Sequence, residues 1–383
     1  MNYWALMKKL RRYVLGSAAA VGVMVVTFEI LSVIAIENQL IPAETPNYRV
    51  PGTRPFWVDA NPHFGMWHPI DEQYVHTKSC FSALYESNSY GARDQQRSKE
   101  SVAPRVLVIG DSFIEGYGLN AQQRTTNLLE VKTGREHLNF ATSGHFGPTQ
   151  YLLLYKHLAK QFRHDAVIVG ILPDNDFLDD DPEFGKINLP NQYRPYFVEN
   201  KEGYKLKYQN PDKMGASKKE KRREKRLFIR RVLQNFTYSV NSINYFTALF
   251  RHQNTYSVRA QESAKIYSGF RDFTESQLKR MEYVLGQLFA EVGPRPVVLV
   301  VIPRPKDLIA LPDGTSPFVE KLAQIIKPFS NVSILDLHAE LRRAGGWEKD
   351  YRTCDDHWSA SGAARVAQYI YHHPAYQKFL NSN

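Results

Sequence analysis

Short aliphatic runs alternate with segments of helical period over the C-terminal two thirds of the chain. Five runs have the length and composition of buried strands: residues 105–109, 137–140, 166–171, 297–302 and 332–335, the second being the weakest. The clearest helical segment is 275–292, where one face carries Leu278, Met281, Leu285, Leu288 and Val292. A further helix is expected to begin after Ser359 as its N-cap. Buried strands separated by amphipathic helices indicate an α/β fold with a parallel sheet covered on both faces.

The pattern at the N-terminus is continuously apolar. Between Tyr13 and Ile36, Glu29 is the only acidic or basic residue, and a helix of this length crosses the hydrocarbon layer of about 30 Å in a bilayer. The run is longer than the core of a signal peptide and no small-residue cleavage motif follows it, so an uncleaved anchor is favoured over a cleaved signal. Because a carboxylate is costly in lipid, Glu29 is expected either near an interface or against a helical partner.

Four bases precede the apolar run: Lys8, Lys9, Arg11 and Arg12. Basic flanks stay on the cytoplasmic side of a membrane. Residues 1–12 are therefore predicted to be cytoplasmic, residues 13–36 to form a transmembrane helix, and the chain beyond residue 40 to be periplasmic or extracellular. The sequence predicts a single-pass membrane protein with its main domain outside the cytoplasm.

Two regions interrupt the α/β pattern. Residues 37–104 are rich in Pro, Asn, Ser and aromatic residues, which predicts an irregular extension packed on the domain of residues 105–383. Within that domain, residues from about 180 to 270 are predicted to form a helical insertion, which contains a basic run over 218–226. Such a run is typical of a solvated helix, of a surface for anionic lipid, or of a site for an anionic polymer.

The net charge of +10 is concentrated at two places. The flank before the apolar run contributes +4, and the run at 218–226, with seven bases and two acids, contributes +5. Because the rest of the chain is close to neutral, we expect no nucleic acid among the partners.

The first predicted strand runs directly into Gly110-Asp111-Ser112, which makes Ser112 a candidate nucleophile. Ligands of a doubly wound sheet collect at the carboxyl ends of its strands, where Ser112 is expected to lie. A serine nucleophile needs a base, an acid that orients the base, and donors for the developing oxyanion. Because serines are common in turns without any catalytic role, Ser112 is a nucleophile only if the sequence also provides a base, an acid and oxyanion donors.

Each of these partners has a candidate in the sequence. His357 is the candidate base, and Asp355 is the candidate acid, because residues two apart in an extended loop project to the same side. Asp356 is expected to point away. The candidate oxyanion donors follow the second and third predicted strands: the backbone N–H of Gly144 and the side-chain amide of Asn175.

Four blocks occur in an order that resembles the SGNH (GDSL-type) hydrolases over residues 105–373: Gly110-Asp111-Ser112, Gly144, Asn175-Asp176, and Asp355 with His357. The resemblance implies a flavodoxin-like three-layer α/β/α fold. It also implies Ser112 as nucleophile, His357 as base and Asp355 as orienting acid. The implied oxyanion hole consists of the N–H groups of Ser112 and Gly144 and the side chain of Asn175.

Two positions depart from the usual pattern of that family. Pro173 stands where most members have a glycine, and Cys354 stands three residues before His357, where most have an aspartate. The sequence Asp-x-His-Trp is instead similar to the branch that includes periplasmic alginate O-acetyltransferases and related polysaccharide-modification proteins. The N-terminal anchor and the segment Asn88-Ser89-Tyr90-Gly91-Ala92-Arg93 are also similar to exported members of that kind.

The resemblance implies acyl transfer through a covalent serine ester, with acetyl esters of an envelope or secreted polysaccharide as substrate. The acyl group would pass to water or to a sugar hydroxyl, and a transferase would need an acetyl-donor membrane protein as partner. Two alternatives stay open. One is a lipid esterase or thioesterase at the bilayer, with an acyl channel lined by residues 227–250, and the other is a non-catalytic scaffold in a polysaccharide assembly complex.

The remaining candidates concern cofactors and cysteines. No cofactor or metal is expected, because the spacing of the acidic run at 174–183 does not match an EF-hand loop. The chain has two cysteines, Cys80 and Cys354, both beyond the predicted anchor, where a disulfide is permitted. One intramolecular disulfide and two free buried thiols are the alternatives.

Overall fold

The structure, a computed structural model, describes residues 3–38, 40–41, 43, 45–46, 48, 56–78, 80–190, 192–210, 218–247 and 267–382. The chain divides into two compact units. The smaller unit comprises residues 1–54, 77–80 and 217–255, and the larger comprises residues 55–76, 81–216 and 256–383.

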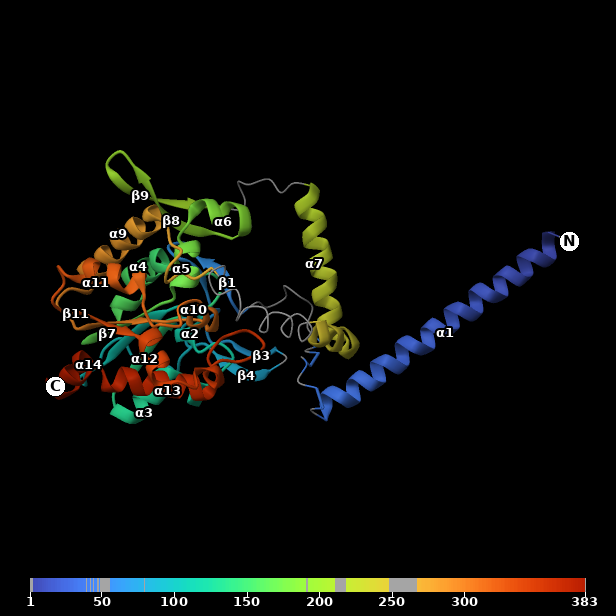
Figure 1. Ribbon diagram of the computed structural model, residues 1–383, viewed down its shortest axis with the longest axis horizontal. Helices are drawn as coiled ribbons and strands as arrows, with labels where there is room; N and C mark the ends of the chain where they lie inside the picture. The colour runs from blue at the N-terminus through green and yellow to red at the C-terminus, as the bar shows by residue number, and fades with distance from the viewer. Residues whose placement is uncertain are drawn as a thin grey trace. The chain divides into compact units, whose positions relative to one another are not determined.

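The larger unit is built on a five-stranded parallel sheet with the strand order β11-β10-β7-β5-β6 (Figure 1). The strands are β5 (Val106–Gly110), β6 (His137–Ala141), β7 (Ala166–Ile171), β10 (Val297–Val301) and β11 (Val332–Asp336). Their aliphatic side chains are buried on both faces, as is typical of parallel sheets. The five strands expected from the aliphatic runs, and the α/β class, are confirmed.

Helices cover both faces of this sheet. One hydrophobic core contains Leu107 and Ile109 of β5 and is closed by α4 (Pro148–His157), α9 (Glu275–Val292) and α11 (Pro317–Ile326). A second core contains Val106 and Val108 of β5 and is closed by α3 (Thr125–Thr133), α12 (Leu337–Ala344), α13 (Ala360–His372) and α14 (Pro374–Ser382). Because successive strand residues point to opposite faces, one strand supplies both cores, which gives three layers.

Two of these helices begin as the sequence predicts. Thr274 accepts a hydrogen bond from the N–H of Gln277 at 3.2 Å and starts α9 at Glu275, the first residue of the expected helix. Ser359 accepts one from the N–H of Gly362 at 3.2 Å and starts α13. Each cap satisfies a backbone donor that has no partner within its helix.

The extension before the sheet contains strands that the sequence did not predict. They are β1 (Val58–Asn61), β2 (Gly65–Trp67), β3 (Gln73–Lys78) and β4 (Phe81–Glu86), which form two small antiparallel sheets, β1 with β2 and β3 with β4. The irregular conformation expected for residues 37–104 is thus corrected for these segments. Strands of three to six residues are too short to establish a period of two.

The insertion predicted as helical also contains a hairpin. Residues 180–210 form α6 (Pro182–Asn188) and then the antiparallel strands β8 (Arg194–Asn200) and β9 (Gly203–Gln209), so a purely helical insertion is wrong. Its helical part is α7 (Lys218–Phe236) and a second helix over residues 238–247. The parts of the predicted insertion at 211–217 and 248–266 lie outside the described residues.

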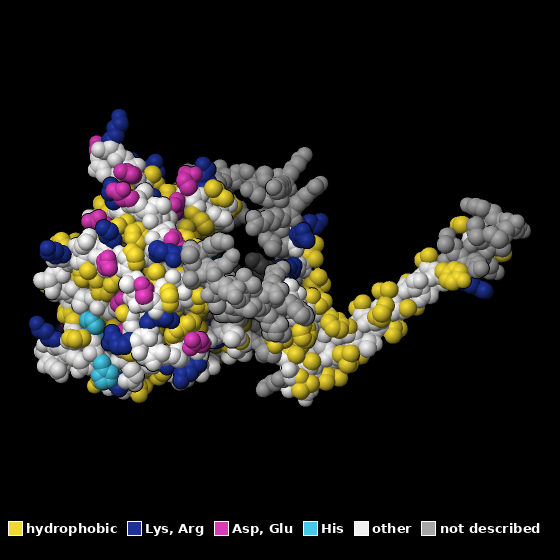
Figure 2. Space-filling model, in the orientation of Figure 1, with side chains coloured by type: hydrophobic (Ala, Val, Ile, Leu, Met, Phe, Trp, Pro, Cys, Tyr) yellow, Lys and Arg dark blue, Asp and Glu magenta, His cyan; other side chains and the backbone are white. Residues whose placement is uncertain are grey.

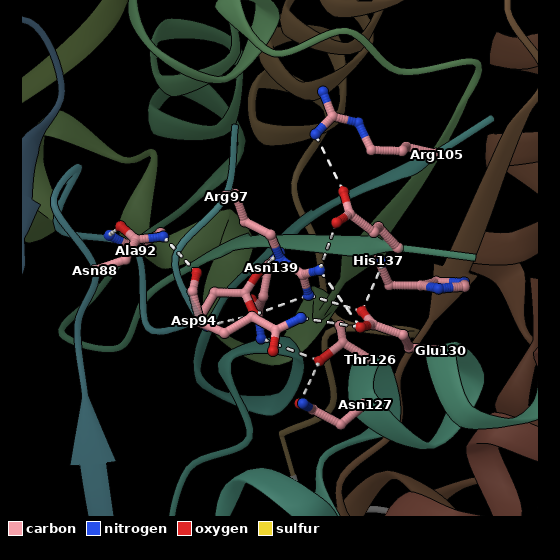
Figure 3. A network of polar contacts seen from close by, with 12 residues as sticks. Asn88, Ala92, Asp94, Arg97, Arg105, Thr126, Asn127, Glu130, His137 and Asn139 are labelled. Carbon is pink, nitrogen blue, oxygen red and sulfur yellow. Dashed lines mark hydrogen bonds and ion pairs between the residues drawn. The ribbon is translucent and has the colours of Figure 1, made fainter. Parts of the chain in front are cut away.

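A buried polar network fastens the extension to the core (Figure 3). Arg97 pairs with Asp94 at 2.9 Å and with Glu130 of α3 at 2.7 Å. Asp94 also accepts a hydrogen bond from the N–H of Asn139 on β6 at 3.2 Å. A buried charge is stable only when it is paired and hydrogen-bonded. The contacts therefore fix residues 88–97 against the edge strand β6.

The smaller unit contains the long N-terminal helix α1 (Tyr3–Glu37). Within α1, residues Arg11–Glu37 are long and apolar enough to cross a membrane, with a mean hydropathy of 2.4, and a membrane anchor and a signal sequence both meet that description. Hydrophobic side chains cover this helix (Figure 2). Both cysteines of the chain, Cys80 and Cys354, are disulfide-bonded, so the alternative of two free thiols is wrong.

Candidate active site

Ser112 lies at the carboxyl end of β5, the strand that separates β6 from β7. Asp111 is the N-cap of the short helix α2 (Ser112–Glu115) and accepts a hydrogen bond from the N–H of Phe113 at 3.0 Å. At Gly110 a Cβ atom would lie 2.5 Å from Cγ1 of Ile114, so the turn needs glycine there. As a result Ser112 is partly exposed between two buried neighbours.

His357 is brought to Ser112 from the other end of the chain. Its Nε2 lies 2.8 Å from the Ser112 Oγ, a hydrogen-bonding distance. The imidazole lies between two aromatic rings, that of Phe113 at 4.8 Å and that of Tyr117 at 4.4 Å between centroids. These contacts hold the imidazole over the helix that carries Ser112.

Asp355 and His357 share one side of their loop, as their spacing predicts. His357 Nδ1 lies 3.6 Å from Asp355 Oδ1, and the same oxygen accepts a hydrogen bond from the N–H of His357 at 3.2 Å. Asp356 points elsewhere: its backbone has a φ of +61°, and its carboxylate pairs with Arg304 at 3.3 Å. The geometry therefore favours Asp355 over Asp356 as the partner of the imidazole.

Gly144 and Asn175 follow the two strands that flank β5. Gly144 lies beyond β6 with a φ of +102°, and a Cβ there would lie 3.0 Å from Cε of Met66, so this position favours glycine twice over. Asn175 lies in α5 (Pro173–Asp179), beyond β7, and its amide donates to Asp179 Oδ2 at 2.9 Å. Pro173 occupies the first turn of α5, where a proline is tolerated, so its departure from the family pattern does not disturb the helix.

Buried carboxylates lie beneath these residues. Burial, together with the neighbouring charge of Asp179, raises the pKa of Asp111 to about 7, although hydrogen bonds from the N–H of Phe113 and from Asn175 act to lower it. Burial and the charge of Asp111 also raise the pKa of Asp176, which accepts a hydrogen bond from the hydroxyl of Tyr151 at 2.9 Å. Protonated carboxyl groups donate as well as accept, so these groups can act as neutral supports of the site.

A further buried carboxylate near Ser112 belongs to Glu115, which was not singled out from the sequence. It accepts hydrogen bonds from Nε1 of Trp57 at 3.0 Å and from the hydroxyl of Ser143, and its Oε1 lies 3.1 Å from Nε2 of His68. Burial acts to raise its pKa, but His68, Arg93 and Ser143 together lower it. Glu115 thus links the helix of the nucleophile to the residue before Gly144.

Arg93 supports the same helix from the extension. Its guanidinium is buried and donates to the carbonyls of Glu115 at 3.0 Å, Gly116 at 2.7 Å and Leu119 at 2.5 Å. These are carbonyls at and after the end of α2, which have no partner within the helix. The segment Asn88–Arg93, noted in the sequence for its resemblance alone, therefore has a physical role beside Ser112.

Arg352 ties the loop of His357 to the turn after α2. Its Nε lies 3.4 Å from Asp355 Oδ1, and its Nη2 donates a hydrogen bond to the carbonyl of Tyr117 at 2.5 Å. A β-bridge between Tyr351 and Trp358 closes the loop around it. Charged side chains in a loop carry no periodic signal, so this contact could not be predicted from the sequence.

Comparisons with known proteins give likeness of fold alone. No known protein family matches the sequence, and no curated protein matches it. Among solved structures, a member of the lipolytic G-D-S-L family from Veillonella parvula is 10% identical, with coverage of 70% of this chain and 96% of that one and a TM-score of 0.36. A lipase/acylhydrolase from Enterococcus faecalis is 11% identical, with coverage of 73% and 96% and a TM-score of 0.37.

An acetyl xylan esterase from the rumen bacterium Butyrivibrio proteoclasticus is 10% identical, with coverage of 72% of this chain and 65% of that one and a TM-score of 0.28. Identities and TM-scores this low do not assign an activity. What the chain has in common with these proteins is an α/β architecture, here with a five-stranded parallel sheet, and the chemistry has to be argued from the geometry around Ser112.

Proposed function

We propose that this protein is a serine esterase or O-acyltransferase in which Ser112, His357 and Asp355 form the catalytic triad. The observation that carries the proposal is the 2.8 Å distance between the Ser112 Oγ and Nε2 of His357, with Asp355 on the opposite side of the imidazole. A nucleophile, a base and an orienting acid in this order are the minimal parts of acyl transfer.

In this mechanism His357 removes the proton of Ser112 as the Oγ attacks the carbonyl carbon of an ester. The resulting imidazolium is stabilised by Asp355 and returns its proton to the departing alcohol, which leaves an acyl-serine. Water or a sugar hydroxyl then attacks the acyl-serine, giving up its proton to His357, and Ser112 is regenerated. The N–H groups of Ser112 and Gly144 and the amide of Asn175 are the proposed donors to the oxyanion.

The proposed substrate is an acetyl ester of an envelope or secreted polysaccharide. Support comes from the resemblance of the Asp-x-His-Trp sequence to polysaccharide O-acetyltransferases, and from the apolar helix α1, which we propose is an uncleaved anchor. In that topology the larger unit lies outside the cytoplasm. A transferase in this place needs an acetyl donor supplied across the membrane by a partner protein, because a single span forms no transport path.

The test is ester hydrolysis by the full chain in detergent, comparing p-nitrophenyl acetate with the octanoate. We expect turnover of the acetate, loss of it in Ser112→Ala and in His357→Ala, and retention in Ser361→Ala, which changes an exposed serine of α13. A clear preference for octanoate would favour the lipid esterase alternative. Equal hydrolysis by wild type and Ser112→Ala would overturn the proposal.

A further inference from the structure

We propose that the C-terminal half of α7 and the helix over residues 238–247 lie in the bilayer interface beside α1, on the side of the membrane where α1 ends. This inference rests on the proposed role of α1 as an anchor and concerns the smaller unit alone. It assigns a lipid surface as the partner of apolar side chains that are about half exposed in the described part of the chain.

The first observation is the position of Glu29 within the apolar helix. Its carboxylate accepts hydrogen bonds from the backbone N–H groups of Tyr238 at 2.8 Å and Ser239 at 2.9 Å, the first residues of the second helix. A helix N-terminus is a favourable partner for a carboxylate. At 1.5 Å per residue, Glu29 lies about 12 Å along α1 before Glu37. The second helix, over residues 238–247, therefore begins beside the apolar part of α1 and not beyond its end.

The second observation is that, among the side chains of α1 that the structure describes, those covered lie in the last turns of the helix. Ser32 and Ile36, four residues apart on one helical face, are buried, whereas Leu31 and Ile34 on the other faces are exposed. Tyr238 also donates from its hydroxyl to Glu37 at 2.5 Å. The first residues of the second helix therefore contact α1 in its last turns, and the exposed side chains of α1 are left for lipid.

The third observation is an apolar surface on the two attached helices. Six large apolar side chains are each between 40 and 53% exposed: Phe228, Ile229, Leu233, Phe236, Ile243 and Phe246. Ile229, Leu233 and Phe236 of α7 follow one another at intervals of four and three residues, which places them on one face, and Phe228 is next to Ile229 in the sequence. Apolar surface of this extent is unfavourable in water. Because the two helices are attached to α1, which we propose spans the membrane, these side chains can contact lipid instead of water.

The fourth observation is the charge next to this surface. Lys225, Arg226 and Arg230 are exposed on α7, at the end of the basic run over 218–226. Bases near an anionic membrane are attracted to its surface. Tyr48, whose ring contacts that of Phe236 at 6.1 Å, adds an aromatic group of the kind found at membrane interfaces. Apolar and basic residues in one helix are the pattern of an interfacial helix.

The experiment uses the full chain in vesicles of phosphatidylethanolamine and phosphatidylglycerol, with p-benzoylphenylalanine placed singly at Phe228, Phe236 or Phe246. After illumination, intact mass identifies the molecule that has been crosslinked. The same photoreactive residue is placed at Val25, which is exposed on α1, to test whether α1 lies in lipid. It is also placed at Val131, which is exposed on α3 of the larger unit, to measure the background level of crosslinking. Esterase turnover and near-UV circular dichroism show that each variant is folded.

We expect a gain of one phospholipid mass at Val25, Phe236 and Phe246 and none above background at Val131. At Phe228, beside the bases, phosphatidylglycerol should be captured in excess of its share of the vesicle. A lipid adduct at Val25 with none at Phe236 or Phe246, or crosslinks between two copies of the chain at those positions, would overturn the inference and leave the anchor intact. No lipid adduct at Val25 would overturn the anchor and the inference together, without bearing on the triad.

Discussion

The Oγ of Ser112 lies 2.8 Å from Nε2 of His357, although 245 residues separate the two in the chain. The serine is carried by the end of the strand that β6 and β7 flank, and the histidine by a loop that precedes a helix packed on the same sheet. The loop of His357 is itself held by the bridge between Tyr351 and Trp358 and by Arg352, so the pair keeps its geometry without substrate. The pair is therefore a property of the fold, and its consequences can be tested by single substitutions.

The first prediction distinguishes the two neighbouring aspartates. Asp355→Asn removes the charge that stabilises the imidazolium, and kcat for p-nitrophenyl acetate should fall by about 10²–10⁴. Asp356→Asn removes only the ion pair with Arg304, so its kcat should stay within about tenfold of wild type. Initial rates of the two variants at pH 7.5 are the measurement. A larger loss in Asp356→Asn would reassign the acid of the triad.

The second prediction concerns Glu115 as a positioning residue. Glu115→Gln weakens the contacts with His68 and Ser143 that join the nucleophile's helix to the residue before Gly144. We expect kcat to fall by about tenfold to a hundredfold with KM little changed, since a small displacement of oxyanion donors is costly. Steady-state kinetics separate the two parameters.

The matched control is Glu130→Gln, which weakens the buried ion pair with Arg97 away from Ser112. Both variants should lose stability in urea denaturation, by about 3 kcal/mol or less. If Glu130→Gln lowered kcat as much as Glu115→Gln, the effect would be one of stability, and the positioning role would be wrong.

The third prediction concerns the oxyanion. Asn175→Ala removes one proposed donor and should lower kcat by about 10²–10³ while the enzyme still forms an acyl-serine slowly. Asn188→Ala, at an exposed position of α6, is the control and should have wild-type rates. Single-turnover rates of acylation are the measurement. A wild-type rate in Asn175→Ala would show that the amide serves Asp179 alone.

The fourth prediction is a pH dependence of stability from Asp111. Its pKa is raised from 3.8 to about 7 by burial, so the unfolded chain releases this proton first. The protonated Asp111 stabilises the folded protein, and this contribution to the free energy of unfolding is fully present below about pH 4. It is lost as the pH rises to about 7, by at most about 1.4 kcal/mol per pH unit. Asp111→Asn keeps the N-cap without this loss, and so its stability relative to wild type should increase between pH 4 and pH 7.

The control is Asp181→Asn, because Asp181 is the N-cap of the more exposed helix α6. Urea midpoints at pH 4.5, 6 and 8 give the comparison. A difference between Asp111→Asn and wild type that stays constant over this range would mean that Asp111 is ionised throughout and that its burial is compensated.

Strands β5, β7 and β10 could be predicted because each is an aliphatic run that is buried along its whole length, whereas β6 contains His137 and Asn139 and gives a weaker pattern. The triad candidates could be singled out because their roles require particular residue types at the ends of such strands. The hairpin of β8 and β9 was not predicted, because neither strand is a continuous apolar run: β8 is buried at its start and exposed at its end, and β9 alternates between exposed and partly buried residues. The roles of Glu115 and Arg93 could not be predicted, because their partners, such as Ser143 and the carbonyl of Leu119, are brought close only by the fold.

The most direct test of the central claim is the intact mass of the full chain after brief exposure to p-nitrophenyl acetate, followed by peptide mapping. Our account predicts a gain of one acetyl group on Ser112 and no gain in Ser112→Ala or His357→Ala. The acetylated form should accumulate at low pH when no sugar acceptor is added. An acetyl group on another residue, or a folded wild-type protein with no adduct and the same turnover as Ser112→Ala, would contradict it.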